Sequence, residues 1–456
     1  MLPFTEIVRR CFEGPYIAQE DFDLQVFVRH LEAVREEYGI RFQPETPVPW
    51  DDSLADRVFQ AGVEFYRRVG TYCIDTERMI RFSESEIQEA LQAAPEETEF
   101  GEGRDRKRLK PRAPESEAAP WCFLGAAGAP VSCEDVFLSI VEGYGRIPLA
   151  DSITSPTLTS IGGTRVRANT PLEILACITS SSLVREALSR ADRPGLPVMN
   201  SIATASSDAA KIAGSQFGLR PSDGWLIGSL AELKITFERL NEVAYVNGIK
   251  GRICGESGPL LGGYCGGPEG VAIANVAYHL QAILVLRGVC HVTFPLHFNR
   301  VCNSSRDLLW AISVSSQAIS RNSHFPFFTI PNTASGPVEE MCFLETAAIV
   351  ASLVASGSSL EALGVYRNAT VDLQTPQGPQ FAAEVAHGVL GLSRREANRL
   401  VLRLLDRYER SLDSPPRGKT YQESYDFKTA KPKAETQRLH DRMKREISQL
   451  GVGFKR

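Results

Sequence analysis

A glycine-rich segment carries the pattern with the clearest chemical potential in this sequence. Residues 254–267 read CGESGPLLGGYCGG and place one carboxylate, Glu256, and one aromatic residue, Tyr264, among six glycines. Glycine lets the backbone approach another group closely or adopt a positive φ. A carboxylate here serves either as a ligand group or as a helix cap. A phosphate-binding loop is not indicated, because the G-x-x-x-x-G-K-[ST] lysine and a clean G-x-G-x-x-G are both missing.

Metal and redox motifs are not found in the sequence. The ten cysteines are scattered and form no C-x-x-C pair, and the seven histidines show no H-x-x-x-H or H-E-x-x-H spacing. A zinc ribbon, a thioredoxin-type site and a zincin site are therefore not predicted. Reduced thiols in a cytoplasmic protein are the simplest interpretation.

Composition favours an ordinary globular protein. The 456 residues are 43% hydrophobic and carry a formal net charge of −5. A nucleic-acid-binding protein would show a basic face. The amino terminus lacks the long apolar core of a signal peptide, and no apolar run reaches the ~18 residues that span a bilayer. We therefore expect a soluble, cytoplasmic protein that binds neither nucleic acid nor membrane.

Residues 1–120 are predicted to form a helical extension that packs on the rest of the chain. Helical periodicity is visible at 21–38 and 54–69, and Ser83 with Glu86 begins like a capping box. The charged, proline-containing run at 101–120 predicts an exposed loop.

The pattern of apolar residues changes between residues 121 and 410, where short apolar runs alternate with helical patterns. This alternation predicts parallel β/α units, enough of them to close a (β/α)8 TIM barrel of ~250 residues. A doubly wound sheet is the alternative, but its glycine fingerprint is missing. Residues 411–456 are predicted to form a loop and a last helix. Expected strands lie at 197–206, 242–249 and 288–298, and expected helices at 170–190, 208–218, 270–285, 304–321 and 339–355.

In a TIM barrel, active residues come from the carboxyl ends of the strands. Several polar and aromatic residues fall near such positions in the predicted pattern. The candidates are Met199, Asn200, Asp223, Trp225, Glu256, Tyr264, His297 and Asn299.

An ordered set of segments resembles the archaeal monomethylamine methyltransferase family, whose members are corrinoid-dependent and use pyrrolysine. The resemblance covers nearly the whole chain and implies a TIM barrel, a symmetric homo-oligomer and a separate corrinoid protein that docks over the barrel mouth. The cofactor would be carried by that partner. The matching segments are GTYCIDTERMIRFSESEI (70–87), GAPVSCEDVF (128–137), TPLEILA (170–176), RPG (193–195), AELKI (231–235), GPLLGGYCGG (258–267), EMCFLE (340–345) and GKTYQESYD (418–426).

The chain departs from this family at the residues that matter most. Counting from RPG without gaps places the family's pyrrolysine at Met199, with Asn200 one position along. An acidic residue of the family falls near Leu226, and a pocket glutamine falls near Ile330. We therefore expect a member of the family that lacks pyrrolysine.

Other positions match the family's site. Glu256 aligns with a carboxylate of that site, and His297 and Arg306 align with its P-x-H…R segment. The resemblance thus implies Glu256 and His297 as catalytic candidates. The substrate-binding candidates are Met199, Asn200, Trp225, Leu226, Tyr264, Ile330, Asn332 and Arg306.

The substitution at Met199 changes the chemistry that we expect. Pyrrolysine is thought to capture methylamine as an electrophile, whereas methionine has neither an imine nor a proton to give. A quaternary ammonium donor fits, because its fixed charge makes the departing amine neutral. Such a ligand needs a carboxylate and aromatic faces. Glu256 would supply the carboxylate, and the available aromatic residues are Trp225, Tyr264, Phe298, Phe327 and Phe328.

Two alternatives remain open at this point. The donor could be a methoxy or S-methyl compound, in which case Glu256 or His297 would protonate the leaving atom. The barrel could also bind a small molecule without catalysing a reaction, because a fold can be kept in evolution after its original activity is lost.

Overall fold

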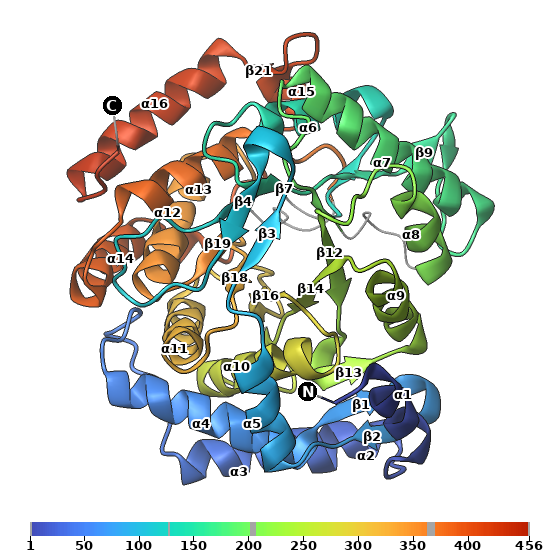
Figure 1. The fold of residues 1–456 in the computed structure, drawn as a ribbon. Coiled ribbons are helices and arrows are strands. Elements are labelled where there is room, and N and C mark those ends of the chain that lie inside the picture. The colour runs from blue at the N-terminus through green and yellow to red at the C-terminus, as the bar shows by residue number, and fades with distance from the viewer. Residues whose placement is uncertain (1, 126–127, 201–206, 363–369, 455–456) are drawn as a thin grey trace.

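Eight parallel strands form a closed barrel at the centre of the molecule (Figure 1). The structure is a computed structural model that describes residues 2–125, 128–200, 207–362 and 370–454. The ring closes at a bridge between Ile153, in the last strand of the order given below, and Val198, which directly precedes the first strand. In order around the barrel, the strands are β11 (Met199–Asn200), β12 (Gly224–Gly228), β14 (Arg252–Ser257), β16 (Cys290–Thr293), β18 (Phe327–Thr329), β19 (Ser359–Ala362), β5 (Cys122–Leu124) and β7 (Ser152–Ile153).

A helix follows each strand and covers the outside of the barrel, so the predicted (β/α)8 TIM barrel is confirmed. Two of these helices, α10 and α12, are buried on almost every side because further helices pack over them. In chain order the helices are α6 (Glu134–Gly145), α7 (Pro171–Arg190), α8 (Asp208–Ser215), α9 (Phe237–Gly248), α10 (Pro268–Leu284), α11 (Arg306–Asn322), α12 (Glu340–Ala355) and α13 (Gln377–Gly388).

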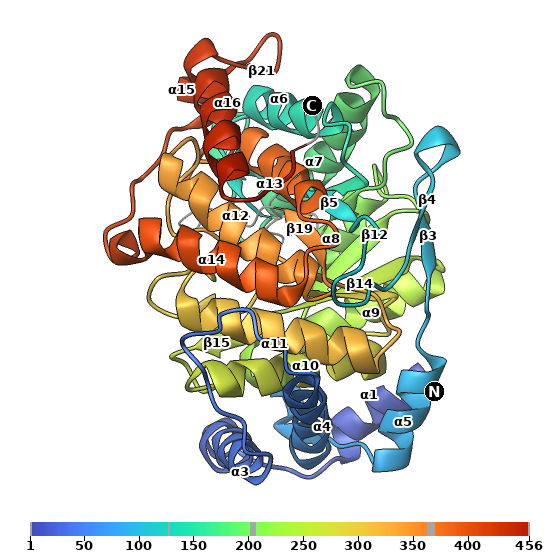
Figure 2. The same ribbon diagram turned by 90° about the vertical axis from the view of Figure 1, so that its left-hand side faces the viewer.

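The amino-terminal extension packs on one side of the barrel. Its longest helix, α4, lies against α10 and α11, and Figures 1 and 2 show the extension beneath these two helices. The pattern of its helix α5 is confirmed in detail, because Ser83 and Glu86 form a complete capping box. The helical elements are α1 (Phe4–Glu13), α2 (Gln19–Asp21), η1 (Phe22–Val28), α3 (Arg29–Glu37), α4 (Asp52–Val69), η2 (Ile74–Thr76), α5 (Glu84–Ala93) and η3 (Gly103–Asp105).

The extension also contains two hairpins that the sequence did not predict. One joins β1 (Thr71–Cys73) to β2 (Arg78–Ile80). On its other side, β1 pairs in parallel with β13 (Lys234–Ile235), which lies in the connection between β12 and α9. The other joins β3 (Thr98–Phe100) to β4 (Lys107–Leu109).

Two further expectations about local structure were wrong. Residues 242–249 were expected to form a strand, but 242–248 belong to α9, where Val243 and Val246 lie one helical turn apart and are both fully buried. The charged run at 101–120 is not simply an exposed loop, because it contains β4 and the buried Arg112. Tertiary packing overrides the local pattern in both cases.

The carboxy-terminal part adds a helical layer over α12 and α13 (Figure 2). No helix among the described residues is long and apolar enough to cross a membrane. The remaining elements are β6 (Pro130–Val131), β8 (Thr157–Leu158), β9 (Ser160–Ile161), β10 (Thr164–Arg165), η4 (Ala231–Leu233), β15 (Leu260–Leu261), β17 (Leu296–His297), α14 (Arg394–Tyr408), η5 (Glu409–Ser411), α15 (Tyr421–Ser424), β20 (Tyr425–Asp426), β21 (Lys431–Pro432) and α16 (Ala434–Gln449).

Candidate functional site

The barrel interior is filled by its own cluster of apolar side chains. Alternate residues of a strand point to opposite faces, so one set faces the interior and the other packs against the surrounding helices. The interior cluster is separate from the two larger clusters outside the barrel. It consists of Phe100, Leu109, Trp121, Phe123, Met199, Leu226, Cys254, Cys290, Val292, Phe328 and Ile330.

Met199 belongs to this interior cluster and is fully buried. The hydroxyl of Ser152 lies 3.4 Å from its sulfur. Its side chain crosses Gly224 on the neighbouring strand, where an added Cβ would come within 2.8 Å of the methionine Cγ. The glycine is therefore needed at this position so that Met199 can reach into the barrel.

Glu256 lies near the carboxyl end of β14, one residue before the strand ends. It pairs in register with Val292, a member of the interior cluster, so its carboxylate projects on the interior side. Gly228 on the adjacent strand leaves room for it, because an added Cβ would lie 3.8 Å from a carboxylate oxygen. This position is where TIM-barrel enzymes place their reacting groups.

The charge of Glu256 is influenced by two cations on neighbouring helices. Burial raises the pKa of Glu256, and the positive charges of Lys211 and Arg239 oppose that rise. These two cations share one carboxylate, because Lys211 Nζ lies 2.8 Å and Arg239 2.6 Å from oxygens of Glu242. Their combined charge therefore exceeds that of Glu242, and the surplus favours ionised Glu256.

Leu226 and Ile330 both lie within the interior cluster. The two positions that the resemblance assigns to polar pocket groups are thus part of an apolar wall. Asn332 is buried in the loop after β18, where its backbone N–H donates to Asn303 Oδ1 at 2.8 Å. Its side-chain amide donates to the carbonyl of Ile330 at 3.1 Å, so Asn332 stabilises the loop.

Trp225, which was expected to contact a cationic ligand, does not face the barrel interior. Trp225 lies on the outward face of β12, where its ring packs 5.6 Å from that of Tyr245 on α9. It belongs to the cluster outside the barrel. Asn200 is its register partner on β11, and Asn200 Oδ1 accepts a hydrogen bond from Ser155 at 3.2 Å. Strand alternation directs both residues away from the side that Met199 occupies.

Three other candidates lie outside the barrel interior. Tyr264 is 44% exposed in the loop after β15. His297 lies on β17, and its Nδ1 accepts the backbone N–H of Asn299 at 3.2 Å within its own turn. Arg306 forms a two-pronged ion pair with Glu409, at 3.0 and 2.7 Å. His297 and Arg306 thus have contacts of their own outside the barrel interior, and the roles expected for them stay predictions.

A second carboxylate faces the barrel interior and was missed by sequence reasoning. Glu361 is 1% exposed and, like Glu256, stands one residue before the end of its strand. It pairs in register with Phe123 of the interior cluster. Burial, followed by the nearby Cys254 and Glu361, raises the pKa of the Cys290 thiol on the same inner wall. In the sequence it is a lone acid in the short segment SLEA, 359–362, which does not reveal the face that Glu361 occupies.

A chain of buried polar groups supports β14 from outside the barrel. Ser257, next to Glu256, lies 2.7 Å from His291 Nε2, and the Nδ1 atoms of His291 and His279 are 3.4 Å apart. His279 Nε2 lies 3.0 Å from Ser323 Oγ. This chain links β14 to helices α10 and α11 and fixes the strand that carries Glu256. Across the described ranges, no cluster of three His, Cys, Asp or Glu side chains could hold a metal ion.

Comparison with known families identifies the relationship. The family model described as monomethylamine methyltransferase MtmB matches residues 2–452. The chain belongs to the monomethylamine methyltransferase family. Family membership makes the protein a methyltransferase, and it agrees with the (β/α)8 barrel described above.

Individual relatives agree with this assignment over nearly the whole chain. Monomethylamine methyltransferase MtmB1 of Methanosarcina barkeri is 30% identical over 97% of this chain and 96% of its own length. MtmB of Methanosarcina mazei shows the same identity and coverage. The crystal structure of the M. barkeri monomethylamine methyltransferase and that of a hydroxylamine complex of MtmB both match with a TM-score of 0.94. Each is 29% identical, and each alignment covers 99% of this chain and 98% of the solved one.

Proposed function

We propose that this methyltransferase transfers a methyl group from a quaternary ammonium compound to the cobalt(I) of a corrinoid protein. One observation carries the proposal: Met199 occupies an interior position of the barrel wall, on the side that Glu256 and Glu361 also face. The resemblance assigns this position to pyrrolysine. An apolar side chain at this point removes the electrophile that a primary amine requires.

Recognition of a fixed positive charge is supported by the inner wall. Glu256 and Glu361 supply negative charge near the carboxyl ends of two strands. The aromatic surface comes from Phe123 and Phe328, whose rings pack edge to face at 6.2 Å, and not from Trp225. Apolar and aromatic walls with nearby carboxylates suit a methylated cation, because aromatic faces attract it and little water competes.

The proposed transfer needs no acid from the protein. The methyl carbon–nitrogen bond breaks, the nitrogen keeps the electron pair, and the tertiary amine leaves as a neutral molecule. Cobalt(I) is the nucleophile that the partner's corrinoid supplies when it is bound. The residues of this chain would orient the methyl group toward the open end of the barrel, and catalysis would rest mainly on this positioning.

The partner is proposed to approach the carboxyl ends of the strands. Two exposed aromatic side chains lie on the loops there, Tyr264 at 44% and Phe298 at 60% exposure. Exposed aromatic residues are frequent anchors of protein interfaces. We further propose that the enzyme works as a cytoplasmic homo-oligomer, as the family resemblance implies.

The first experiment is a binding screen with purified protein. Tetramethylammonium, choline and glycine betaine are compared with monomethylamine and with 3,3-dimethylbutanol, an uncharged analogue of choline. A ligand that binds the folded state raises the melting temperature, Tm. We expect a shift with at least one quaternary compound and none with 3,3-dimethylbutanol or monomethylamine. Hits are then tested for methylation of a cobalt(I) corrinoid by absorption spectroscopy.

Substitutions locate the site. Glu256→Gln and Glu361→Gln should each weaken binding of the best quaternary ligand roughly tenfold, because a charge partner inside a protein contributes more than one in water. Glu186→Gln is the control, since Glu186 is paired with Arg190 on the surface of α7. Equal binding by all three variants would contradict the proposal, as would preference for monomethylamine.

A further inference from the structure

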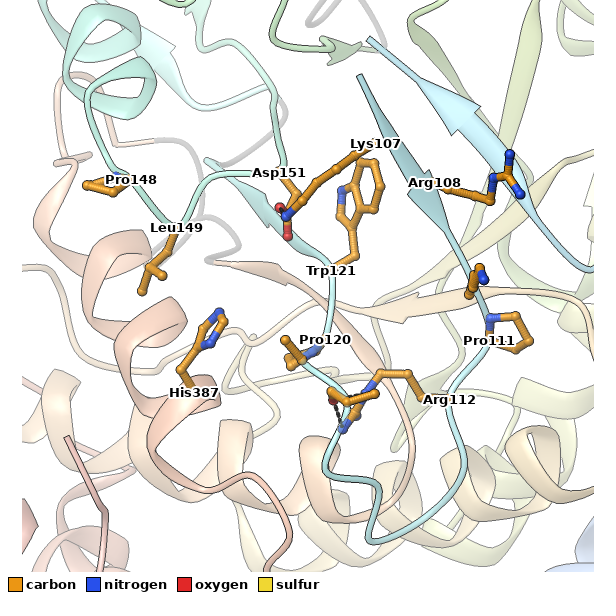
Figure 3. A pocket seen from close by; sticks show the side chains of 13 residues that line it. Lys107, Arg108, Pro111, Arg112, Pro120, Trp121, Pro148, Leu149, Asp151 and His387 are labelled. Carbon is orange, nitrogen blue, oxygen red and sulfur yellow. Dashed lines mark hydrogen bonds and ion pairs between the residues drawn. The ribbon is translucent and has the colours of Figure 1, made fainter. Parts of the chain in front are cut away.

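A cavity of about 350 Å³ lies at the opposite end of the barrel from Glu256. Its walls come from the segments that lead into β5 and β7, from β4 and the residues after it, and from α13 (Figure 3). It meets the amino ends of the strands, whereas Glu256 and Glu361 stand near the carboxyl ends. The cavity is therefore separate from the proposed methyl-transfer site.

The cavity wall contains a buried guanidinium group. Arg112 is 7% exposed and makes five hydrogen bonds, all to backbone carbonyls, among them those of Ala118 at 3.0 Å and Ser358 at 2.9 Å. Among the residues that the structure describes, no carboxylate forms an ion pair with it. Burial lowers the pKa of Arg112 to about 10, so the group still carries its charge at neutral pH.

Three more cations border the cavity, and each already has an acidic neighbour. Lys107 pairs with Asp151, Arg108 bonds to Glu99 at 3.1 Å, and Lys110 lies 3.7 Å from Glu97. Glu97 is also bonded by Arg108. These acids balance the three cations of the β4 segment, which leaves the charge of Arg112 as the surplus.

One lysine of this segment can respond to a ligand. The side chains of Lys110 and Glu97 are 64% and 44% exposed, and an exposed ion pair of this kind contributes little to stability. The ammonium group of Lys110 can therefore turn from Glu97 to a bound anion at small cost, whereas Lys107 stays with the buried carboxylate of Asp151. The buried Arg112 provides a fixed positive charge, and Lys110 provides mobile N–H donors.

The remaining wall is apolar and aromatic. Figure 3 shows the Trp121 indole beside the Lys107–Asp151 pair, with Pro120 and Arg112 below it in the view. A second cavity of about 600 Å³ shares Pro148, Leu149 and His387 with the first. Both volumes are typical of small-molecule sites.

We propose that this cavity binds a small organic oxyanion, a phosphate or a carboxylate. The anionic group lies toward Arg112 and Lys110, and the carbon body of the ligand packs against Trp121 and the neighbouring prolines. The second cavity gives a longer ligand room to extend. The proposal does not depend on the methyl donor.

Calorimetric titration and thermal shift in Tris chloride buffer test the proposal. The probes are inorganic phosphate, citrate and adenosine monophosphate, with adenosine as the uncharged control for the nucleotide. We expect saturable binding of at least one anion, no binding of adenosine, and weaker binding as sodium chloride rises. Binding of phosphate alone indicates a bare oxyanion site, whereas citrate or the nucleotide alone identifies the carboxylate or the organic phosphate.

Variants decide whether binding occurs in this cavity. Lys110→Glu reverses an exposed charge and should weaken anion binding roughly tenfold, while Lys428→Glu, on the exposed β20–β21 turn, should leave binding unchanged. Arg112→Met should abolish binding if the variant folds. The proposal is overturned if none of the three anions binds, or if Lys110→Glu binds as tightly as the unaltered protein. Equal weakening by Lys428→Glu would also overturn it, since it would indicate general attraction. A failed methyl-transfer assay leaves all of these results unaffected.

Discussion

Met199 shows how one side chain can both fill a core and define a site. It is fully buried, and Gly224 has no Cβ in its path. The side chain therefore contributes packing energy inside the barrel in addition to excluding an electrophile. Truncating the Met199 side chain, compared with replacing it by one of similar volume, should measure its packing contribution.

Met199→Ala should lower the free energy of unfolding by about 2–5 kcal/mol, because it leaves a cavity in a packed interior. Met199→Leu keeps most of the volume and should cost less than about 1.5 kcal/mol. Urea unfolding followed by tryptophan fluorescence measures both values. Equal stability of the alanine variant and the unaltered protein would show that Met199 is not packed as described.

Glu256 should make ligand binding depend on pH. Its pKa is raised by burial above the ordinary value of 4.5, so the carboxylate gains a proton earlier than usual as the pH falls. A quaternary ammonium ligand binds the ionised form, and its affinity should therefore fall as the pH drops through this raised pKa. Glu256→Gln should bind more weakly and lose this part of the pH dependence. Titration calorimetry across the acidic range provides the measurement, and an unchanged profile in the variant would exclude Glu256 as the titrating group.

The two carboxylates differ in how visible they are in the sequence. Glu256 could be predicted because glycines surround it and because the family resemblance matches it. Glu361 could not be placed, because a strand of four residues does not reveal which face is inward. The same ambiguity concerns Trp225, whose outward direction could not be predicted, since a shift of one residue reverses the face of every side chain.

At the scale of elements, the buried polar chain from Ser257 through His291 and His279 to Ser323 contains two groups that can take up a proton. Burial lowers the pKa of His291 to about 3, and burial followed by His291 lowers the pKa of His279 well below its usual value. Both rings are therefore neutral in the folded protein. On unfolding they regain ordinary pKa values near 6.5 and take up protons below that pH.

The free energy of unfolding should consequently fall as the pH drops from about 6.5 toward 3. In this window the unfolded chain binds more protons than the folded one, and each such histidine contributes a slope of about 1.4 kcal/mol per pH unit. Urea unfolding at a series of pH values measures the slope. His291→Asn should reduce it, whereas Ser323→Ala, which changes a neighbour without removing a titrating group, should leave it the same. An equal slope in the His291 variant would contradict this account.

Helices and strands were predictable where the spacing of apolar residues repeats over several turns. They were less predictable where tertiary contacts determine whether a short segment becomes a helix or a strand. The helices that became α7, α10, α11 and α12 were located to within a few residues, because each spans four or more turns. The segment 242–249 has β-branched residues and reads as a strand in isolation. In the fold, its apolar residues face the barrel at helical spacing and α9 results.

At the scale of the whole molecule, the extension and the tail are tied to the barrel by specific contacts. Arg306 at the start of α11 bonds to Glu409 and to the carbonyl of Pro44, so one side chain joins the barrel to the segments on either side of it. The barrel could be predicted from the strand–helix alternation together with the family resemblance. The β3–β4 hairpin and its cavity could not be predicted, because charged residues on a short hairpin resemble a solvated loop in the sequence.

The wall of the barrel is not equally strong all the way round. Strands β12 and β14 are paired over five residues, whereas β7 and β11 meet, within the described part of the chain, at one bridge between Ile153 and Val198. Among the described residues, one backbone hydrogen bond crosses that seam, from Ile153 N–H to the carbonyl of Pro197 at 3.0 Å, and the hydroxyls of Thr154 and Ser155 add side-chain bonds to Asn200 Oδ1. Local opening starts where the fewest bonds must break.

The strand pairing between β7 and the segment before β11, immediately beside Met199, should therefore open first. Native-state hydrogen exchange read by mass spectrometry should show the segment around Ile153 losing protection before β14. Uniform protection around the ring would mean that the barrel opens only as a unit. If the seam does open first, Met199 is also the first interior side chain to meet water.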